Sequence, residues 1–282
     1  MLFPKNIGKH LSLDETSLSQ GELYTVLTNK SAKGKQGTIV AIVSGTSSEK
    51  VMEIIQRLPY RLRKKVQEIT LDMAGSMNII AKNCFPNAVL VTDRFHVQKL
   101  AIEAVQELRV KHRWVAIDQE NEAIEKARNS KKSYQPEVLD NGDTRRQLLA
   151  RSRYVLYKNR NNWTSDQKKR ANILFQLYPD IKEAYQLSQE LNWIFETTKE
   201  KIYGYTRLAK WHEKVARAGF KSFNSISRTI MNHYITILNY FDNRSTNAAA
   251  ESFNAKIKAF RTQFRGVRNI EFFLFRLAQI YA

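Results

Sequence analysis

The hydrophobic pattern of this chain changes once, near residue 93, and that change limits the folds it can adopt. Before it, runs rich in β-branched residues alternate with runs of helical spacing. From about residue 95 to 246 the spacing is helical, interrupted only by short polar segments. The sequence therefore predicts a mixed α/β sheet that carries a large all-helical segment.

Five strands are expected in the first part. Residues 10–16 alternate between apolar and polar, and 22–28 and 38–43 are rich in strand-forming residues. Turn-forming residues at 19–21 and 33–34 connect them, and such short connections favour a three-stranded antiparallel meander. Strands at 68–72 and 88–93 follow, each preceded by a helix, so these two should be parallel. The expected order is β-β-β-α-β-α-β.

This pattern divides the chain into three parts. Residues 1–97 form the first part of an α/β core, 98–245 an all-helical insertion, and 246–282 the last helices of the core. Trp163, Trp193 and Trp211 are expected to fill the core of the helical insertion, with stacking on DNA bases as the alternative.

Charge indicates the kind of partner. The 282 residues include 46 Lys and Arg against 27 Asp and Glu, a net charge of +19, while 43% hydrophobic residues favour a folded chain. A polyanion is the expected partner, and nucleic acid is favoured over an anionic membrane. Each basic run alone could be a solvated helix face, but together they support this interpretation. The runs are 61–65, 109–113, 168–170 and 261–268.

Cysteine usage and hydropathy exclude several classes of protein. A single cysteine, Cys84, excludes a disulfide framework and a cysteine-based zinc finger within this sequence, and we expect it in the core. The sequence has neither a signal peptide nor a run of apolar residues long enough to span a bilayer. We therefore expect a soluble, cytoplasmic protein.

Three aspartates occupy strand positions that often build sites. Asp14 lies on the first expected strand, and Asp72 and Asp93 end the fourth and fifth. Ligands of open α/β sheets gather at the carboxyl ends of strands, so these side chains could share a site. The alternative for each is an aspartate that caps the following helix.

A fourth acidic residue lies on a late amphipathic helix. Its apolar stripe consists of Phe253, Ile257, Phe260 and Phe264. Its polar stripe consists of Asn247, Glu251, Asn254 and Lys258. This second stripe is either an exposed face or a surface on which Glu251 binds a metal ion and its neighbours contact phosphate.

Carboxylates on a basic protein suit one type of chemistry. Mg²⁺ prefers oxygen ligands, and two such ions can activate the attacking oxygen and stabilise the leaving oxygen of a phosphodiester. Basic residues would meanwhile bind the DNA backbone. The combination predicts a nuclease or a strand-transfer enzyme.

Several segments resemble those of a known family. They are Leu71-Asp-Met73, Phe85-Pro-Asn-Ala88, Asp93-Arg-Phe-His-Val97 and the stretch 247–258. With the strand order, they resemble the ribonuclease H-like DDE transposases, and in particular a branch of bacterial insertion-sequence transposases that looks related to the Mutator-like group. The resemblance implies an α/β, ribonuclease H-like mixed sheet with its helical insertion before the last catalytic helix.

The resemblance also implies roles for individual residues. Asp14, Asp72 and Glu251 would be the catalytic residues and would hold two Mg²⁺ or Mn²⁺ ions. Asp93 and His96 would correspond to a D-x-x-H element that positions DNA or the site; without the resemblance, His96 is a packed or capping histidine.

Three more polar residues are placed near this set. Asn254 and Lys258, on the glutamate helix, are expected to bind DNA or position the site. Glu15 could support the site beside Asp14.

The implied function is cleavage of the ends of a mobile element and transfer of the freed 3′-hydroxyl into target DNA. Double-stranded DNA and a homodimer on that DNA are the expected partners, in the nucleoid of a bacterium. Members of this branch usually carry an amino-terminal zinc-binding and helix-turn-helix region, which does not precede Asp14 here. We expect a separate end-recognition polypeptide, with a gene fragment as the alternative.

Two other functions fit the same residues. One is a ribonuclease H-like nuclease without strand transfer, such as a junction resolvase. The other is an inactive DNA-binding protein descended from a transposase.

Overall fold

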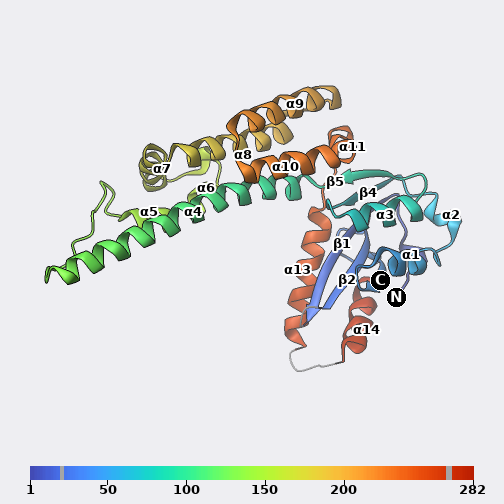
Figure 1. The fold of residues 1–282 in the computed structure, drawn as a ribbon. Helices are drawn as coiled ribbons and strands as arrows, with labels where there is room; N and C mark the ends of the chain where they lie inside the picture. Colours follow the sequence, from blue (N-terminus) through green and yellow to red (C-terminus); the bar gives the residue numbers. More distant parts are fainter. Residues whose placement is uncertain (20–21, 265–268) are drawn as a thin grey trace. The chain divides into compact units, whose positions relative to one another are not determined.

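A computed structural model of the chain describes all residues except 20–21 and 265–268 (Figure 1). The chain forms two compact units. The sheet unit comprises residues 1–96 and 233–282, and the helical unit comprises residues 97–232. The predicted turn at 19–21 lies partly outside the described residues. The basic residues Arg265 and Arg268 lie wholly outside them.

The sheet unit is built on five strands in the order β3-β2-β1-β4-β5. β1 pairs antiparallel with β2, and β2 with β3, whereas β1 pairs parallel with β4, and β4 with β5. Short connections join the antiparallel strands and helices join the parallel ones, as chain geometry requires. The strands are β1 (His10–Ser19), β2 (Glu22–Asn29), β3 (Ile39–Ser44), β4 (Glu68–Leu71) and β5 (Val89–Thr92).

Helices cover both faces of this sheet. On one face α1 (Ser48–Ile55) and α3 (Gly75–Cys84) pack on a cluster that contains Leu13 and Leu27. On the other, α13 (Ala248–Gln263) and α14 (Ile270–Tyr281) bury Phe253 and Phe273 against Val26. Val26 and Leu27 are consecutive on β2 and enter opposite clusters, as the pleat requires. Burial on both faces explains why the middle of β2 is apolar almost throughout.

Cys84 is buried at the end of α3, and burial raises the pKa of its thiol to about 11. The prediction of a core cysteine is therefore confirmed. A thiol with so high a pKa stays protonated near neutral pH and behaves as a small apolar side chain.

Short elements complete the sheet unit. They are the 3₁₀ turns Pro4–Asn6 and Lys30–Ala32, α2 (Tyr60–Arg63), α11 (Tyr234–Leu238) and α12 (Tyr240–Asn243). The Asn239 side chain donates a hydrogen bond of 2.8 Å to the Leu90 carbonyl on β5. The chain thus rejoins the sheet unit at His233, whereas the sequence placed the end of the insertion at residue 245. Helical periodicity could not reveal this difference, because residues 233–243 are helical too.

The helical unit consists of helices and one 3₁₀ turn among its described residues. These are α4 (Arg94–Asn129), whose first three residues belong to the sheet unit, α5 (Arg145–Arg151), α6 (Arg153–Tyr157), the turn Arg160–Asn162, α7 (Ser165–Leu177), α8 (Pro179–Thr197), α9 (Lys201–Ala218) and α10 (Lys221–Asn232). Thr144 and Thr164 begin α5 and α7 with capping boxes, which satisfy backbone amides at these helix starts.

The tryptophan prediction is right at two positions and wrong at a third. Trp163 and Trp211 are buried in the helical unit, but Trp193 is 49% exposed. Trp193 lies on α8 outside the stripe that the helix buries, and the Arg207 guanidinium lies 4.6 Å from its ring centroid. Hydrophobicity alone does not show on which side of a helix a residue falls.

Among the described residues, none of the helices combines the length and the apolar character that a bilayer-spanning segment needs.

Candidate active site

Asp14 lies in the middle of β1, and its carboxylate is held on both oxygens. Oδ1 accepts a hydrogen bond from the Glu15 amide at 2.8 Å, and Oδ2 accepts one from the Asn254 side chain at 2.7 Å. Asn254 is on α13, so this bond ties the glutamate helix to β1 across about 240 residues of sequence. The contact brings the Asn254 side chain against the Asp14 carboxylate.

The pKa of Asp14 is raised, chiefly by burial. The charges of Asp72 and Glu251 raise this pKa further, while the Glu15 amide and the charge of His96 lower it. These side chains therefore share one electrostatic environment, although they come from β1, β4, α4 and α13. Glu15 is part of the same environment, because the charges of Asp72 and Asp14 add to burial in raising its own pKa.

Asp72 follows the last residue of β4. The parallel pairing of Ser12 with Thr70, continued by two residues, brings Asp72 beside Asp14. Oδ1 of Asp72 accepts a hydrogen bond of 2.8 Å from the Ala74 amide, which turns the chain toward α3. This bond closes a turn before the helix rather than capping it, because the N-cap of α3 is Ala74, and it leaves the other oxygen of Asp72 available.

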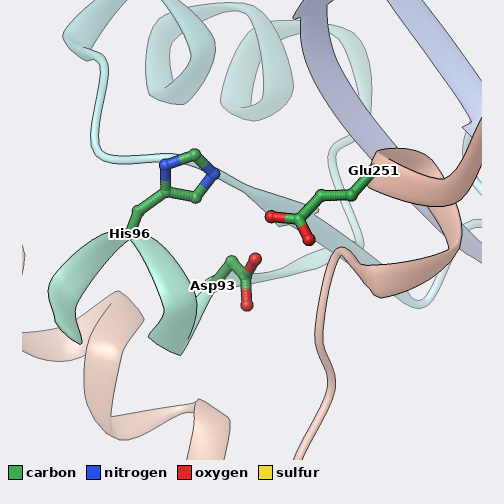
Figure 2. A group of neighbouring side chains, drawn as sticks. All are labelled: Asp93, His96 and Glu251. Carbon is green, nitrogen blue, oxygen red and sulfur yellow. The ribbon is translucent and has the colours of Figure 1, made fainter. Parts of the chain in front are cut away.

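Asp93, His96 and Glu251 form a tight group (Figure 2). Each offers one ligand atom, and these three atoms lie within 4.8 Å of one another. Asp93 follows β5, and its amide donates a hydrogen bond of 2.9 Å to the Leu71 carbonyl at the end of β4. Figure 2 shows all three side chains directed toward a common space between the start of α4 and the start of α13.

Asp93 is the most buried carboxylate of the site, at 1% exposure. Oδ1 accepts a long hydrogen bond of 3.3 Å from the Phe95 amide, while the buried Oδ2 has no hydrogen-bond partner among the described residues. Burial raises the pKa of Asp93, and the amides of Phe95 and Asn247 and the charge of His96 partly offset this. A buried carboxylate oxygen without a partner is costly, and a cation would compensate it.

Asn247 is a site residue whose part the sequence did not reveal. It is fully buried at the N-cap of α13, and its side-chain oxygen accepts a hydrogen bond from the Ser12 hydroxyl on β1. The bond fixes the first turn of α13, where Glu251 lies, against the central strand. An asparagine before a helix predicts a side-chain cap. Here the side chain forms no cap hydrogen bond and instead contacts a strand 235 residues away, which only the fold shows.

The donor set fits a hard divalent cation. Carboxylates of Asp14, Asp72 and Glu251 offer the oxygen ligands that Mg²⁺ and Mn²⁺ take, and Asp93 adds a fourth carboxylate. Within the described part of the chain, no lysine or arginine forms an ion pair with Asp14, Asp72 or Asp93. Among the described residues, Asp93, His96 and Glu251 are the only three His, Cys, Asp or Glu residues whose ligand atoms all lie within 4.8 Å of one another, so Asp14, Asp72 and Glu251 are not drawn together as tightly. Lys258 lies further along α13 with its side chain exposed.

Comparison with known proteins identifies the family. The family model of the ISL3 group of DDE transposases, described as a transposase, matches residues 11–277, which is most of the chain. The chain belongs to this family.

Two curated transposases illustrate the relationship. The transposase of insertion sequence element IS1001 from Bordetella parapertussis is 22% identical over 272 residues, covering 95% of this chain and 60% of that protein. The transposase of element IS1557 from Mycobacterium tuberculosis H37Rv is 24% identical over 257 residues, covering 89% of this chain and 55% of that protein. The chain thus spans a little over half the length of these relatives. No solved structure matches it significantly.

Two arginines of the predicted DNA-binding runs are buried. Arg63 donates hydrogen bonds to the Leu58 and Cys84 carbonyls, and Arg109 donates to the Leu149 carbonyl and the Gln106 side chain. Each guanidinium donates hydrogen bonds to buried backbone carbonyls, which water cannot reach. Both arginines therefore stabilise the fold. The DNA-binding interpretation of runs 61–65 and 109–113 is therefore wrong at these two positions.

Proposed function

We propose that this chain is the catalytic part of an insertion-sequence transposase with a ribonuclease H-like core. Asp14, Asp72 and Glu251 hold two divalent metal ions, Mg²⁺ or Mn²⁺. The reaction is hydrolysis of a phosphodiester at each element end, followed by attack of the freed 3′-hydroxyl on target DNA. The coexistence of these carboxylates at one edge of the sheet, in a chain of this family, is the observation that carries the proposal.

The metal pair, when bound, would activate the attacking oxygen and stabilise the leaving oxygen. The protein's own contribution is to position the ligands. Asn254 fixes the orientation of Asp14 through its hydrogen bond, and Asn247 fixes the start of the glutamate helix on Ser12. Such supporting contacts set the geometry of a metal site as much as the ligands themselves.

Asp93 and His96 act beside this ligand set. Because they lie close to Glu251, they are suited to orient that carboxylate or DNA that enters the site. The Asp93 oxygen that has no hydrogen-bond partner among the described residues is free to accept such a contact. His96 can also offset the accumulation of negative charge around Asp14 when it is protonated.

The partners follow from the reaction. Double-stranded DNA is the substrate, and two element ends must be processed together, so the chain acts as a homodimer on DNA. A separate end-recognition polypeptide supplies sequence specificity. Exposed Lys168, Lys169 and Lys258 contribute contacts to the DNA backbone.

Strand nicking and joining on DNA with element ends would test the proposal, with Mg²⁺ or Mn²⁺ and any adjacent partner protein present. Wild type should give metal-dependent products. Asp72→Asn should reduce them at least a thousandfold, a loss of about 4 kcal/mol of transition-state stabilisation. The matched control is Asp118→Asn, an exposed aspartate on α4, which should stay active.

Other outcomes would favour the two other functions. Nicking without joining would indicate a nuclease rather than a transposase. Salt-sensitive DNA binding without any nicking by wild type would indicate an inactive transposase-derived protein. Loss of binding together with nicking in Asp72→Asn would contradict the separate roles of the carboxylates and the basic residues.

A further inference from the structure

The helical unit contains a cavity that the reaction above does not use. It lies between the 3₁₀ turn Arg160–Asn162, α7 and α8, and its volume is about 520 Å³. That volume falls in the range of small-molecule sites. All its lining residues belong to the helical unit, so the cavity is complete within that unit.

Three aromatic rings form its apolar wall. Trp163 and Tyr185 stack with centroids 5.5 Å apart, and Phe175 lies 5.5 Å from Tyr185. The polar ends of two rings are already satisfied, because the indole of Trp163 donates to the Val155 carbonyl and the hydroxyl of Tyr185 to the Lys158 carbonyl. The hydrogen bonds hold these two rings in place, and the three rings offer the cavity apolar surface.

Carboxamides supply the polar wall. Asn172, Gln176, Gln186 and Gln189 all line the cavity. Gln189 is the informative member, because both its amide nitrogen and its amide oxygen are buried without a hydrogen-bond partner among the described residues. A buried polar group left unpaired costs about 1–3 kcal/mol. A ligand that reached the Gln189 amide would satisfy both atoms by accepting one hydrogen bond and donating another.

The charge around the cavity is entirely positive. Arg160 and Lys182 line it with exposed side chains, and no aspartate or glutamate does so. The ligand should therefore be anionic, have a flat apolar part, and present a donor and an acceptor side by side. A nucleotide has all three properties: a phosphate, a planar base, and an edge such as that of adenine, which pairs with a carboxamide.

We propose that this cavity receives a single unpaired nucleotide of the DNA on which the transposase acts. Its base enters beside the aromatic wall and bonds to Gln189, and its phosphate lies between Arg160 and Lys182. That the nucleotide belongs to DNA on which the chain acts rests on the proposed function. That the cavity binds a nucleotide at all rests only on the residues that line it. Unpairing a base costs a few kcal/mol, and this is smallest where the strand is already distorted. The cavity would thus favour distorted over regular DNA.

The test compares two duplexes of equal length, one fully paired and one with a single bulged adenine. Fluorescence anisotropy is measured with EDTA present, so that catalysis plays no part. Wild type should bind the bulged duplex about tenfold more tightly. Gln189→Leu, which removes both polar atoms at similar volume, should abolish that preference, and so should Arg160→Ala. Gln135→Leu and Arg128→Ala, at exposed positions of the same unit, are the matched controls.

Competition identifies the chemistry that is bound. Deoxyadenosine monophosphate should displace the bulged duplex from its preferred site, whereas ribose 5-phosphate and inorganic phosphate should not. Equal affinity of wild type for both duplexes would overturn the proposal. So would a preference that survives both Gln189→Leu and Arg160→Ala, or equal competition by phosphate alone. Because Arg160 is exposed, its variant keeps the test valid if Gln189→Leu does not fold.

The two proposals can fail separately. Asp72→Asn should keep the bulge preference although it loses nicking. If nicking is absent but wild type still prefers the bulged duplex, the proposed metal site is contradicted and the cavity proposal stands. If nicking is normal but the preference is absent, only the cavity proposal is contradicted.

Discussion

Asp93 is almost fully buried, and one of its carboxylate oxygens has no hydrogen-bond partner among the described residues. Its negative charge therefore destabilises the folded protein when no cation is present. Its pKa is raised by burial, so the native state binds a proton more readily than the unfolded chain. Stability from this group is therefore greatest at low pH and falls as pH rises from the ordinary aspartate pKa, about 3.9, through the raised native value.

Asp93→Asn should remove the part of the loss of stability with rising pH that comes from Asp93. We expect the metal-free variant to gain about 1 kcal/mol at pH 7 to 8, since a neutral amide replaces a buried charge. Its stability should decline less with pH, and the remaining decline belongs to Asp14 and Glu15, whose pKa values are raised in the same direction. Thermal unfolding in EDTA between pH 4 and 8 measures both effects. A variant less stable than wild type at pH 8 would show that the charge is already compensated.

At the residue scale, spacing gave candidates but not their surroundings. Strand ends predicted Asp72 and Asp93, and the polar stripe predicted Asn254 and Glu251; their assignment to a metal site stays a prediction. What sequence could not show is the contact of Asn254 with Asp14 or the burial of Asn247 against β1. Those contacts join segments more than 230 residues apart, so no local pattern encodes them.

At the scale of elements, Asp143 connects the polar loop after α4 to two helices of the helical unit. It is 1% exposed and accepts hydrogen bonds from Arg151 on α5, Arg170 on α7 and the Asn141 side chain. Burial would raise its pKa, but the hydrogen bonds and charges of the two arginines outweigh burial and hold the pKa below its usual value. Run 168–170 thus contributes one arginine to structure rather than to DNA.

Asp143→Asn should lower the free energy of unfolding by about 2 kcal/mol at pH 7, because both guanidinium groups lose their charged acceptor. With a depressed native pKa, the stability from Asp143 is present above the ordinary aspartate pKa and is lost as pH falls through the native value. The difference between variant and wild type should therefore shrink below about pH 4. Urea unfolding followed by circular dichroism checks this, with Asp118→Asn as control. A difference independent of pH would contradict the linkage.

Helices and strands were predictable where the local hydrophobic pattern fits only one type of secondary structure. Alternation at 10–16 predicted a strand, and β1 runs from His10 to Ser19; the apolar stripe predicted the late helix, and Phe253 and Ile257 are buried on the sheet. The end of the insertion was not predictable, because α11 and α12 have the same periodicity as the helices before them. Contacts with the sheet assign them to the sheet unit: Thr236 and Asn239 form hydrogen bonds with β5, and Asn243 donates one to Glu68 on β4.

At the scale of the whole molecule, a net charge of +19 coexists with a cluster of buried acids. Composition predicts a polyanionic partner but not which cations contact it, since Arg63 and Arg109 are used inside the fold. For the proposed function, the basic residues left at the surface would have to attract DNA and overcome the repulsion between its phosphates and the carboxylates.

Binding to duplex DNA without element ends should consequently depend steeply on salt. We expect the association constant to fall ~1,000-fold or more between 50 and 200 mM salt, the behaviour of a protein with about six or more phosphate contacts. Replacing the exposed pair Lys168 and Lys169 with alanine should reduce the slope of log K against log salt by roughly two. Asp72→Asn should leave the slope unchanged, because the proposed function assigns Asp72 to metal rather than to DNA. A slope that changes with Asp72→Asn but not with the lysine pair would mean that DNA is attracted at the carboxylate site itself, and the division between a binding surface and a metal site would have to be abandoned.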